Sequence, residues 1–158
     1  MSGHGYECKL EHITSIVARF GEAEVVGPVA EGFLANYYVT SGELLGPKIT
    51  GKVLPVGGDW FTVRPDGIGI LDVRLTFETD DGTIIHTSYY GNSDLGPDGY
   101  RQTVAEETPS EDGLELRTCP RFQTAHPDYQ WLNRAFCIGL GKSFVASYTV
   151  NYDIYQVL

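Results

Sequence analysis

The chain has 158 residues, which suits one domain with a hydrophobic core of its own. Its formal net charge is −10 and it has no basic run, which excludes a duplex nucleic-acid binder and argues against attraction to anionic membranes. The 19 glycines, with 10 Tyr, 7 Phe and 2 Trp, favour strands and tight turns over helices.

Strand-like segments dominate the first part of the chain. β-Branched residues favour a strand over Leu10–Phe20, and aromatic and β-branched residues predict another over Phe33–Thr40. Glycine and proline then crowd the stretch Gly42–Trp60, for which we expect mainly a loop, with one short strand around Lys52–Leu54 that Pro55 limits. This stretch ends on the pair Asp59-Trp60, so the loop is expected to place a carboxylate and an indole at a site.

The middle of the chain shows the clearest hairpin. Ile70–Thr79 alternates strictly between apolar and polar residues, which predicts a strand with one buried face. Asp80-Asp81-Gly82 predicts a hairpin turn, and Thr83–Tyr90 predicts the returning strand. Asn92–Arg101 is expected to be a polar loop that acts as a lid or rim, followed by a strand over Gln102–Glu107.

Two alternating segments and one helical turn are predicted near the end of the chain. Leu114–Thr124 alternates but is broken by Pro120, His126–Asn133 suits one helical turn, and Phe144–Ile154 has the cleanest alternation of all. Eight to ten antiparallel strands must protect their edges, and closure into a barrel does this best. We therefore predict an all-β, closed antiparallel barrel with little helix, and a sandwich is the alternative.

No cofactor or metal site is predicted. The cysteines Cys8, Cys119 and Cys137 are odd in number and form no CxxC pair, which argues against a disulfide framework or structural zinc. No H-x-H or HExxH spacing occurs either. No run of about 18 apolar residues and no signal-peptide segment are present, so we expect a cytoplasmic protein. Residues 1–8 are expected to be a loosely ordered tail of a single domain.

Several short motifs together resemble the uncharacterised DUF3237 family, from Leu10 to the end of the chain. They are Gly46-Pro47 through Asp59-Trp60, Asp72-Val73-Arg74, Pro120-Arg121-Phe122, Tyr129-Gln130-Trp131-Leu132-Asn133 and Gly139-Leu140-Gly141. The resemblance implies a compact antiparallel β-barrel, similar in type to allene oxide cyclase and dirigent proteins. Those proteins bind ligands in the barrel and need no metal or organic cofactor, but the relation is one of fold and its functional content is analogy.

Asp59 is the first candidate for a functional group, and two roles are open to it. Its carboxylate could satisfy backbone N–H groups in the Gly57-Gly58 turn. Alternatively, it could lie beside Trp60 in a partly dry pocket, where burial raises the pKa of a carboxyl toward the range of a general acid or base. Trp60 and Trp131 could each be core residues or line the ligand site.

Asp72 and Arg74 are the second candidates, because residues two apart on a strand project from the same face. That face is either the solvated outside, with a weak ion pair, or the lumen of the barrel. In the lumen, Arg74, helped by Arg64 and a tyrosine hydroxyl, would stabilise an enolate or alkoxide oxygen. The residues expected to contact a substrate are Trp60, Arg64, Tyr90, Tyr129 and Trp131. The hydroxyls of Tyr37, Tyr129, Tyr148 and Tyr152 could also orient a carbonyl or phenol ligand.

Two functions remain open from the sequence. The first is a cofactor-independent cyclase, isomerase or lyase that acts on a hydrophobic or aromatic carbonyl compound, with Asp59, Asp72 and Arg74 as catalytic residues. The alternative is a barrel that binds a small molecule without chemistry. In both cases the partner is a small-molecule ligand, no cofactor is expected, and we expect a homodimer or other homo-oligomer.

Overall fold

The chain folds mainly into strands, with three short helical segments among residues 3–158, the part that this computed structural model describes. The strands are β1 (Leu10–Phe20), β2 (Glu24–Val29), β3 (Gly32–Pro47), β4 (Thr50–Val63), β5 (Ile68–Thr79), β6 (Ile84–Asp94), β7 (Leu114–Thr118), β8 (Arg121–Gln123), β9 (Cys137–Phe144) and β10 (Thr149–Val157). The helical segments are the α-helix α1 (Gly99–Val104) and the 3-10 helices η1 (Pro127–Arg134) and η2 (Val145–Ser147).

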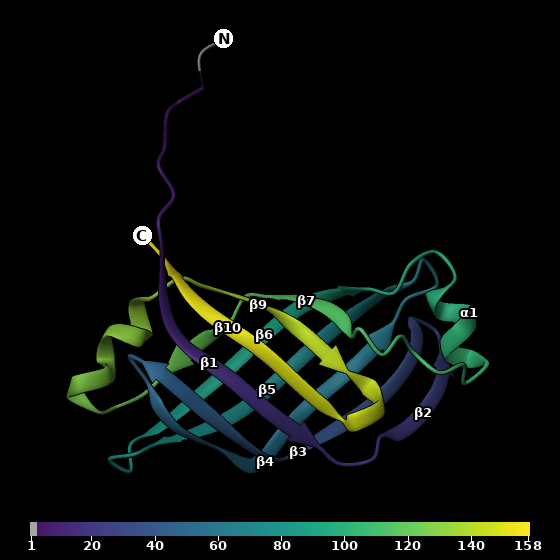
Figure 1. Cartoon of the computed structure of the whole chain (residues 1–158), viewed down its shortest axis with the longest axis horizontal. Helices are drawn as coiled ribbons and strands as arrows, with labels where there is room; N and C mark the ends of the chain where they lie inside the picture. Colours follow the sequence, from purple (N-terminus) through teal and green to yellow (C-terminus); the bar gives the residue numbers. More distant parts are fainter. Residues whose placement is uncertain (1–2) are drawn as a thin grey trace.

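Eight of these strands pair in a closed antiparallel ring (Figure 1). The order is β1-β10-β9-β7-β6-β5-β4-β3, and the second half of β3 closes the ring by pairing with β1. The first half of β3 pairs with β2, and β8 pairs with β6. The predicted closed all-β barrel is therefore confirmed, and closure leaves the ring strands without free edges.

Alternation along the strands decides which side chains form the core. On β5, Leu71, Val73, Leu75 and Phe77 are buried inside the barrel, whereas the polar residues between them are more exposed. Burial of such side chains contributes about 1.5–3 kcal/mol each. The predicted hairpin after β5 is confirmed, because Gly82 donates its N–H to the carbonyl oxygen of Thr79 at 2.9 Å.

The glycine-rich stretch Gly42–Trp60 is not mainly a loop, so that prediction was wrong, although the short strand expected around Lys52–Leu54 does lie in β4. β3 continues to Pro47 and β4 begins at Thr50, so most of the stretch pairs with neighbouring strands. Its glycines serve a bulge instead: the register with β5 shifts between Val53 and Gly57, where Gly57 has φ +96°. A side chain there would meet the carbonyl oxygen of Arg74 at 2.1 Å, so only glycine fits this approach.

Two other predicted strands differ from the structure. Part of Gln102–Glu107 lies in α1. The predicted strand Phe144–Ile154 is interrupted, because β9 ends at Phe144, η2 reverses the chain, and β10 begins at Thr149. Tyr148 permits this reversal with a left-handed backbone, φ +50°. Alternation shows which way side chains face, but it carries no information on where the chain turns back.

The two ends of the barrel are different, with α1 and η1 lying at opposite ends (Figure 1). Next to η1 are the β3–β4 and β5–β6 turns, since Trp131 lies against Lys48 and Tyr129 contacts Asp81. Leu132 of η1 is buried in the core.

Residues 3–8 extend away from the barrel at the η1 end (Figure 1). Residues 3–9 form no strand or helix. The tail expected over residues 1–8 also includes residues 1 and 2, which lie outside the described residues. No helix among residues 3–158 is long and apolar enough to span a lipid bilayer.

Candidate functional site

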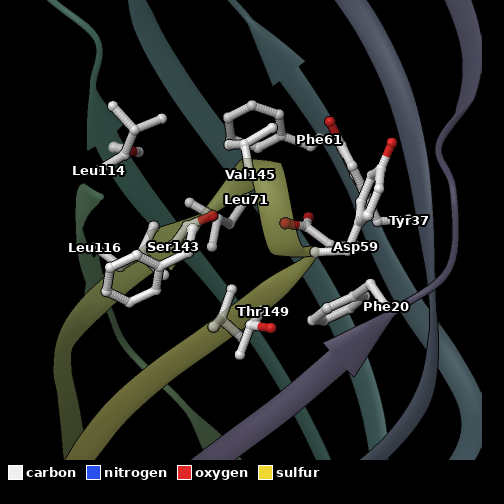
Figure 2. A pocket seen from close by; sticks show the side chains of 14 residues that line it. Phe20, Tyr37, Asp59, Phe61, Leu71, Leu114, Leu116, Ser143, Val145 and Thr149 are labelled. Atoms are coloured by element: carbon white, nitrogen blue, oxygen red, sulfur yellow. The ribbon is translucent and has the colours of Figure 1, made fainter. Parts of the chain in front are cut away.

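A cavity of about 70 Å³ lies inside the barrel at the end where η2 joins β9 to β10 (Figure 2). One water molecule needs roughly 10–15 Å³ on this scale, so the cavity accepts a compact ligand or the end of a longer one. Most of its wall is apolar or aromatic, and the lining residues are Phe20, Tyr37, Asp59, Phe61, Leu71, Ser93, Leu114, Leu116, Ser143, Phe144, Val145, Tyr148, Thr149 and Val150.

Asp59 is the carboxylic acid in this wall. Strand register places Tyr37, Asp59 and Val73 side by side on β3, β4 and β5, all facing the interior. The backbone N–H of Asp72 donates to Oδ1 of Asp59 at 2.9 Å. Figure 2 shows the carboxylate directed into the cavity, between the Tyr37 ring and Leu71. Asp59 therefore accepts one backbone hydrogen bond, from β5 and not from the glycine turn, and also faces the space where a ligand fits.

The surroundings of Asp59 change its acidity. Burial among apolar side chains raises the pKa of this carboxyl from 3.8 to about 7. The hydrogen bond from the Asp72 N–H acts in the opposite direction, and the negative charge of Asp72 adds a smaller increase. A pKa near neutrality lets the carboxyl both take and return a proton, which is what a general acid or base requires.

Replacing Asp59 by Asn is expected to stabilise the fold by about 2–4 kcal/mol above pH 7. The folded state holds the Asp59 proton up to about pH 7, whereas the unfolded chain loses it near 3.8. Wild-type stability therefore falls as pH rises through this window, by at most about 4 kcal/mol for roughly three pKa units. Asn has no proton to lose, and its oxygen can still accept the Asp72 N–H. Urea unfolding at about pH 4.5 and about pH 8 measures the difference.

Asp72→Asn is the matched control for this measurement, because it removes a carboxylate from the same part of the sheet on the outer face. If the advantage of Asp59→Asn over wild type were the same at both pH values, Asp59 would not be a buried acid with a raised pKa.

Two more tyrosines lie in the interior near Asp59. Tyr89 is two strands along from Asp59 in the same row, and its hydroxyl oxygen is 2.5 Å from that of Tyr152. Burial raises the pKa of both hydroxyls, and the charge of Asp59 acts in the same direction. Both side chains therefore remain neutral hydrogen-bonding groups inside the barrel.

The structure places the other two residues that were expected to be catalytic outside the cavity. Asp72 and Arg74 lie on the outer face of β5, with 3.4 Å between Asp72 Oδ1 and Arg74 Nη1. The Arg74 guanidinium also lies 5.7 Å from the ring centroid of Trp60. Asp72, Arg74 and Trp60 therefore form a surface cluster. An exposed ion pair such as Asp72–Arg74 contributes about 0–1 kcal/mol to the stability of the fold. Alternation explains the placement. Asp59 and its register partner Val73 face inward, so the residues on either side of Val73, Asp72 and Arg74, face outward.

The remaining predicted contact residues are also remote from Asp59. Arg64 pairs with Asp66 in the exposed turn after β4. Tyr90 is 64% exposed on the outside of β6. Tyr129 and Trp131 belong to η1, at the opposite end of the barrel from the cavity. Of the residues predicted to be catalytic or to contact the substrate, only Asp59 lines the cavity. Of the four tyrosines whose hydroxyls were expected to orient a ligand, Tyr37 and Tyr148 line it as well.

Sequence reasoning missed most of the cavity wall, although a pattern could have identified part of it. Phe61 follows Asp59 by two residues on β4, so both face the same side. Leu71 belongs to the apolar face of the most regular strand, and alternation alone does not distinguish a core residue from one that lines a cavity. Leu114, Leu116 and Val145 reach the cavity wall only because the ring closes between strands that are distant in the sequence, so no local pattern could have identified them.

A second hollow, on the outer wall near η1, is larger but open to solvent. It runs between β6, β8 and the segment after η1, and includes Cys119, Arg121 and Phe136. Burial raises the pKa of the Cys137 thiol at its edge to about 11, so this thiol stays protonated. Among residues 3–158, no three His, Cys, Asp or Glu side chains gather as metal ligands would. The inner cavity is the better candidate for a functional site, because apolar side chains surround the Asp59 carboxyl.

Comparison with known proteins identifies related chains. The sequence profile of the family described as "Protein of unknown function (DUF3237)" matches residues 8–157. A UPF0311 protein of Rhodopseudomonas palustris (strain TIE-1) is 34% identical over 149 residues, which cover 94% of this chain and 95% of that protein.

Solved structures share the fold. A protein with unknown function from Clostridium acetobutylicum superposes with a TM-score of 0.85 at 27% identity, covering 96% of this chain and 100% of that chain. A protein described as an enzyme from Penicillium herquei superposes with a TM-score of 0.71 at 20% identity, covering 100% of both chains. At that identity, the second similarity shows the fold alone.

Proposed function

The chain belongs to the DUF3237 family, as its motifs predicted, and we propose that it is a cofactor-free enzyme of the cyclase, isomerase or lyase type. Its substrate is a hydrophobic or aromatic carbonyl compound that binds in the barrel. One observation carries the proposal: the Asp59 carboxyl faces an apolar cavity that it does not fill. An acid in such a place lowers the stability of the fold when it is ionised. Proton exchange with a bound ligand would explain why an acid stands there.

The chemistry begins with the ionised Asp59 carboxylate. It removes a proton from the carbon next to the ligand carbonyl, so a C–H bond breaks and an O–H bond forms on Asp59. The electron pair becomes the C=C bond of an enolate, and the negative charge moves to the oxygen. Return of the proton to another carbon gives isomerisation. Attack by the enolate carbon on a second carbonyl carbon of the same molecule forms a C–C bond, breaks that C=O π bond and gives cyclisation, and the new alkoxide takes the proton from Asp59. Loss of a leaving group from the β-carbon gives a lyase reaction, and the departing group takes the proton.

The walls of the cavity support this chemistry by holding the ligand and excluding water. Phe20 and Phe61 present aromatic rings beside Asp59 in Figure 2, and Leu71 closes the opposite side. Flat apolar walls suit a ring-bearing ligand and limit the orientations in which it binds. Exclusion of water also strengthens the interaction between the carboxylate and a developing charge.

The test is loss of deuterium from acetophenone labelled at its methyl group, followed by mass spectrometry in ordinary water. Acetophenone is a compact aryl ketone with acidic hydrogens only beside its carbonyl. The enzyme is expected to accelerate label loss, and the rate is expected to rise with pH and be half-maximal near the Asp59 pKa of about 7. A rate equal to buffer alone for acetophenone and its ring-substituted homologues, or one indifferent to pH, counts against the proposal.

The same assay distinguishes the proposed enzyme from the alternative, a barrel that binds a ligand without chemistry. The mostly apolar wall and the protonated form of Asp59 below pH 7 favour this second function. It predicts saturable binding of acetophenone with complete retention of the label after long incubation.

A further inference from the structure

Two tyrosine side chains line the cavity together with Asp59. Tyr37 comes from β3, and Tyr148 comes from the turn between η2 and β10. Their ring centroids lie 6.5 Å apart, although the two residues are 111 positions apart in the chain. Within residues 3–158, neither hydroxyl makes a hydrogen bond to the protein, so both can donate to a ligand.

The backbone of Tyr148 holds its side chain in an unusual way. Its φ of +50° is one that a bulky side chain rarely adopts, and glycine would fit this position with less strain. Two hydrogen bonds fix the turn: the Tyr148 N–H donates to Val145 at 3.2 Å, and the Phe20 N–H donates to the Tyr148 carbonyl at 2.8 Å. An aromatic residue kept in this conformation beside a cavity indicates a role for the side chain rather than for the turn.

Tyr37 is positioned by regular strand pairing. It lies directly opposite Asp59 in the β3–β4 register, so both side chains face the cavity. Its ring packs edge-on against Phe61, with 6.4 Å between centroids. Burial, followed by Tyr148 and the charge of Asp59, raises the pKa of the Tyr37 hydroxyl, which keeps it protonated as a donor.

We propose that the Tyr37 and Tyr148 hydroxyls bind the carbonyl oxygen of the ligand while Asp59 faces the adjacent carbon. The inference rests on the proposed function and specifies its substrate class: a compact ketone whose oxygen points to these tyrosines and whose flat apolar body lies toward Leu71 and Leu116. Both hydroxyls donate to the oxygen on which negative charge develops when Asp59 removes the proton. Donors placed at that atom stabilise the enolate more than the ketone.

The experiment measures binding of two probes that differ in this one atom. Acetophenone has the carbonyl oxygen, and α-methylstyrene has a CH₂ group in its place. For each protein the ratio of the Kd of α-methylstyrene to the Kd of acetophenone reports how well the site recognises the oxygen. Tyr37→Phe and Tyr148→Phe are each expected to lower this ratio about threefold to tenfold relative to wild type, the effect of one lost hydrogen bond.

Tyr38→Phe is the matched control. Its hydroxyl donates to Glu24 at 2.8 Å on the outside of the same strand, so the ratio is expected to stay as in wild type. Deuterium loss from labelled acetophenone is expected to slow in Tyr37→Phe and Tyr148→Phe but not in Tyr38→Phe.

Ratios within twofold of wild type in both cavity variants overturn the assignment, as does a wild-type protein that binds neither probe. The proposed function fails on a different result, namely no label loss in wild-type protein or unchanged label loss without the Asp59 carboxylate. The two failures are therefore distinguishable.

Discussion

Label loss from deuterated acetophenone is expected to slow by about 100-fold or more in Asp59→Asn, the size of effect that removal of a general base produces. Asn has nearly the same shape and can still accept the Asp72 N–H, which Asp59 receives at 2.9 Å. The variant should therefore keep the cavity and its affinity for the ketone, and lose only the group that takes the proton. Comparing kcat with KM separates these effects, and the loss is expected in kcat.

Asp72→Asn is the control for this kinetic measurement too, because Asp72 lies on the outer face beside Arg74. It removes one negative charge close to Asp59 in the sheet but leaves the cavity intact, so its rate should remain within about threefold of wild type. Equal rates in Asp59→Asn and wild type would remove Asp59 from the mechanism. A comparable loss in both variants would instead point to an effect of net charge.

The second large effect is expected for Gly57→Ala, which should destabilise the fold by about 2–5 kcal/mol. Gly57 has φ +96°, and an L-residue in a left-handed conformation costs about 1–2 kcal/mol. Its Cβ would also stand 2.1 Å from the carbonyl oxygen of Arg74, and relief of that contact must move β4 against β5 at a further cost of about 1–3 kcal/mol. Urea unfolding measures the loss.

Gly27→Ala distinguishes the two causes. Gly27 has nearly the same φ, +95°, but nothing lies within 4 Å of the position that a Cβ would take. It is therefore expected to lose only the conformational part, about 1–2 kcal/mol. Similar losses in both variants would show that the close approach of β4 to β5 at the bulge carries no cost of its own.

The barrel could be predicted from the sequence because its signal is local and repeated. Ile70–Thr79 alternates over a whole strand, and Asp80-Asp81-Gly82 marks the turn that follows, so β5 and its hairpin with β6 need no knowledge of distant residues. The stretch Gly42–Trp60 misled because glycine is ambiguous: it marks loops, but it also permits a bulge inside a paired strand.

The site was only partly predictable, for a different reason. Asp59 stood out as a carboxylate next to an aromatic run, and strand pairing did bring it to the cavity wall. Tyr37 and Tyr148 become neighbours only when the ring closes, and no feature near Tyr148 shows that the chain reverses there. For Asp72 and Arg74, alternation already favoured the outer face, and the structure has them there.

The cavity occupies one end of the barrel, and buried core side chains fill the interior toward η1. Leu132 is buried at the η1 end, and the cavity lies at the other end, beside Val145. If the proposed function holds, the substrate enters and the product leaves at the same end of the barrel, one after the other. Turnover then depends on how quickly the product leaves the cavity, and a product that leaves slowly acts as a competitive inhibitor of the next substrate.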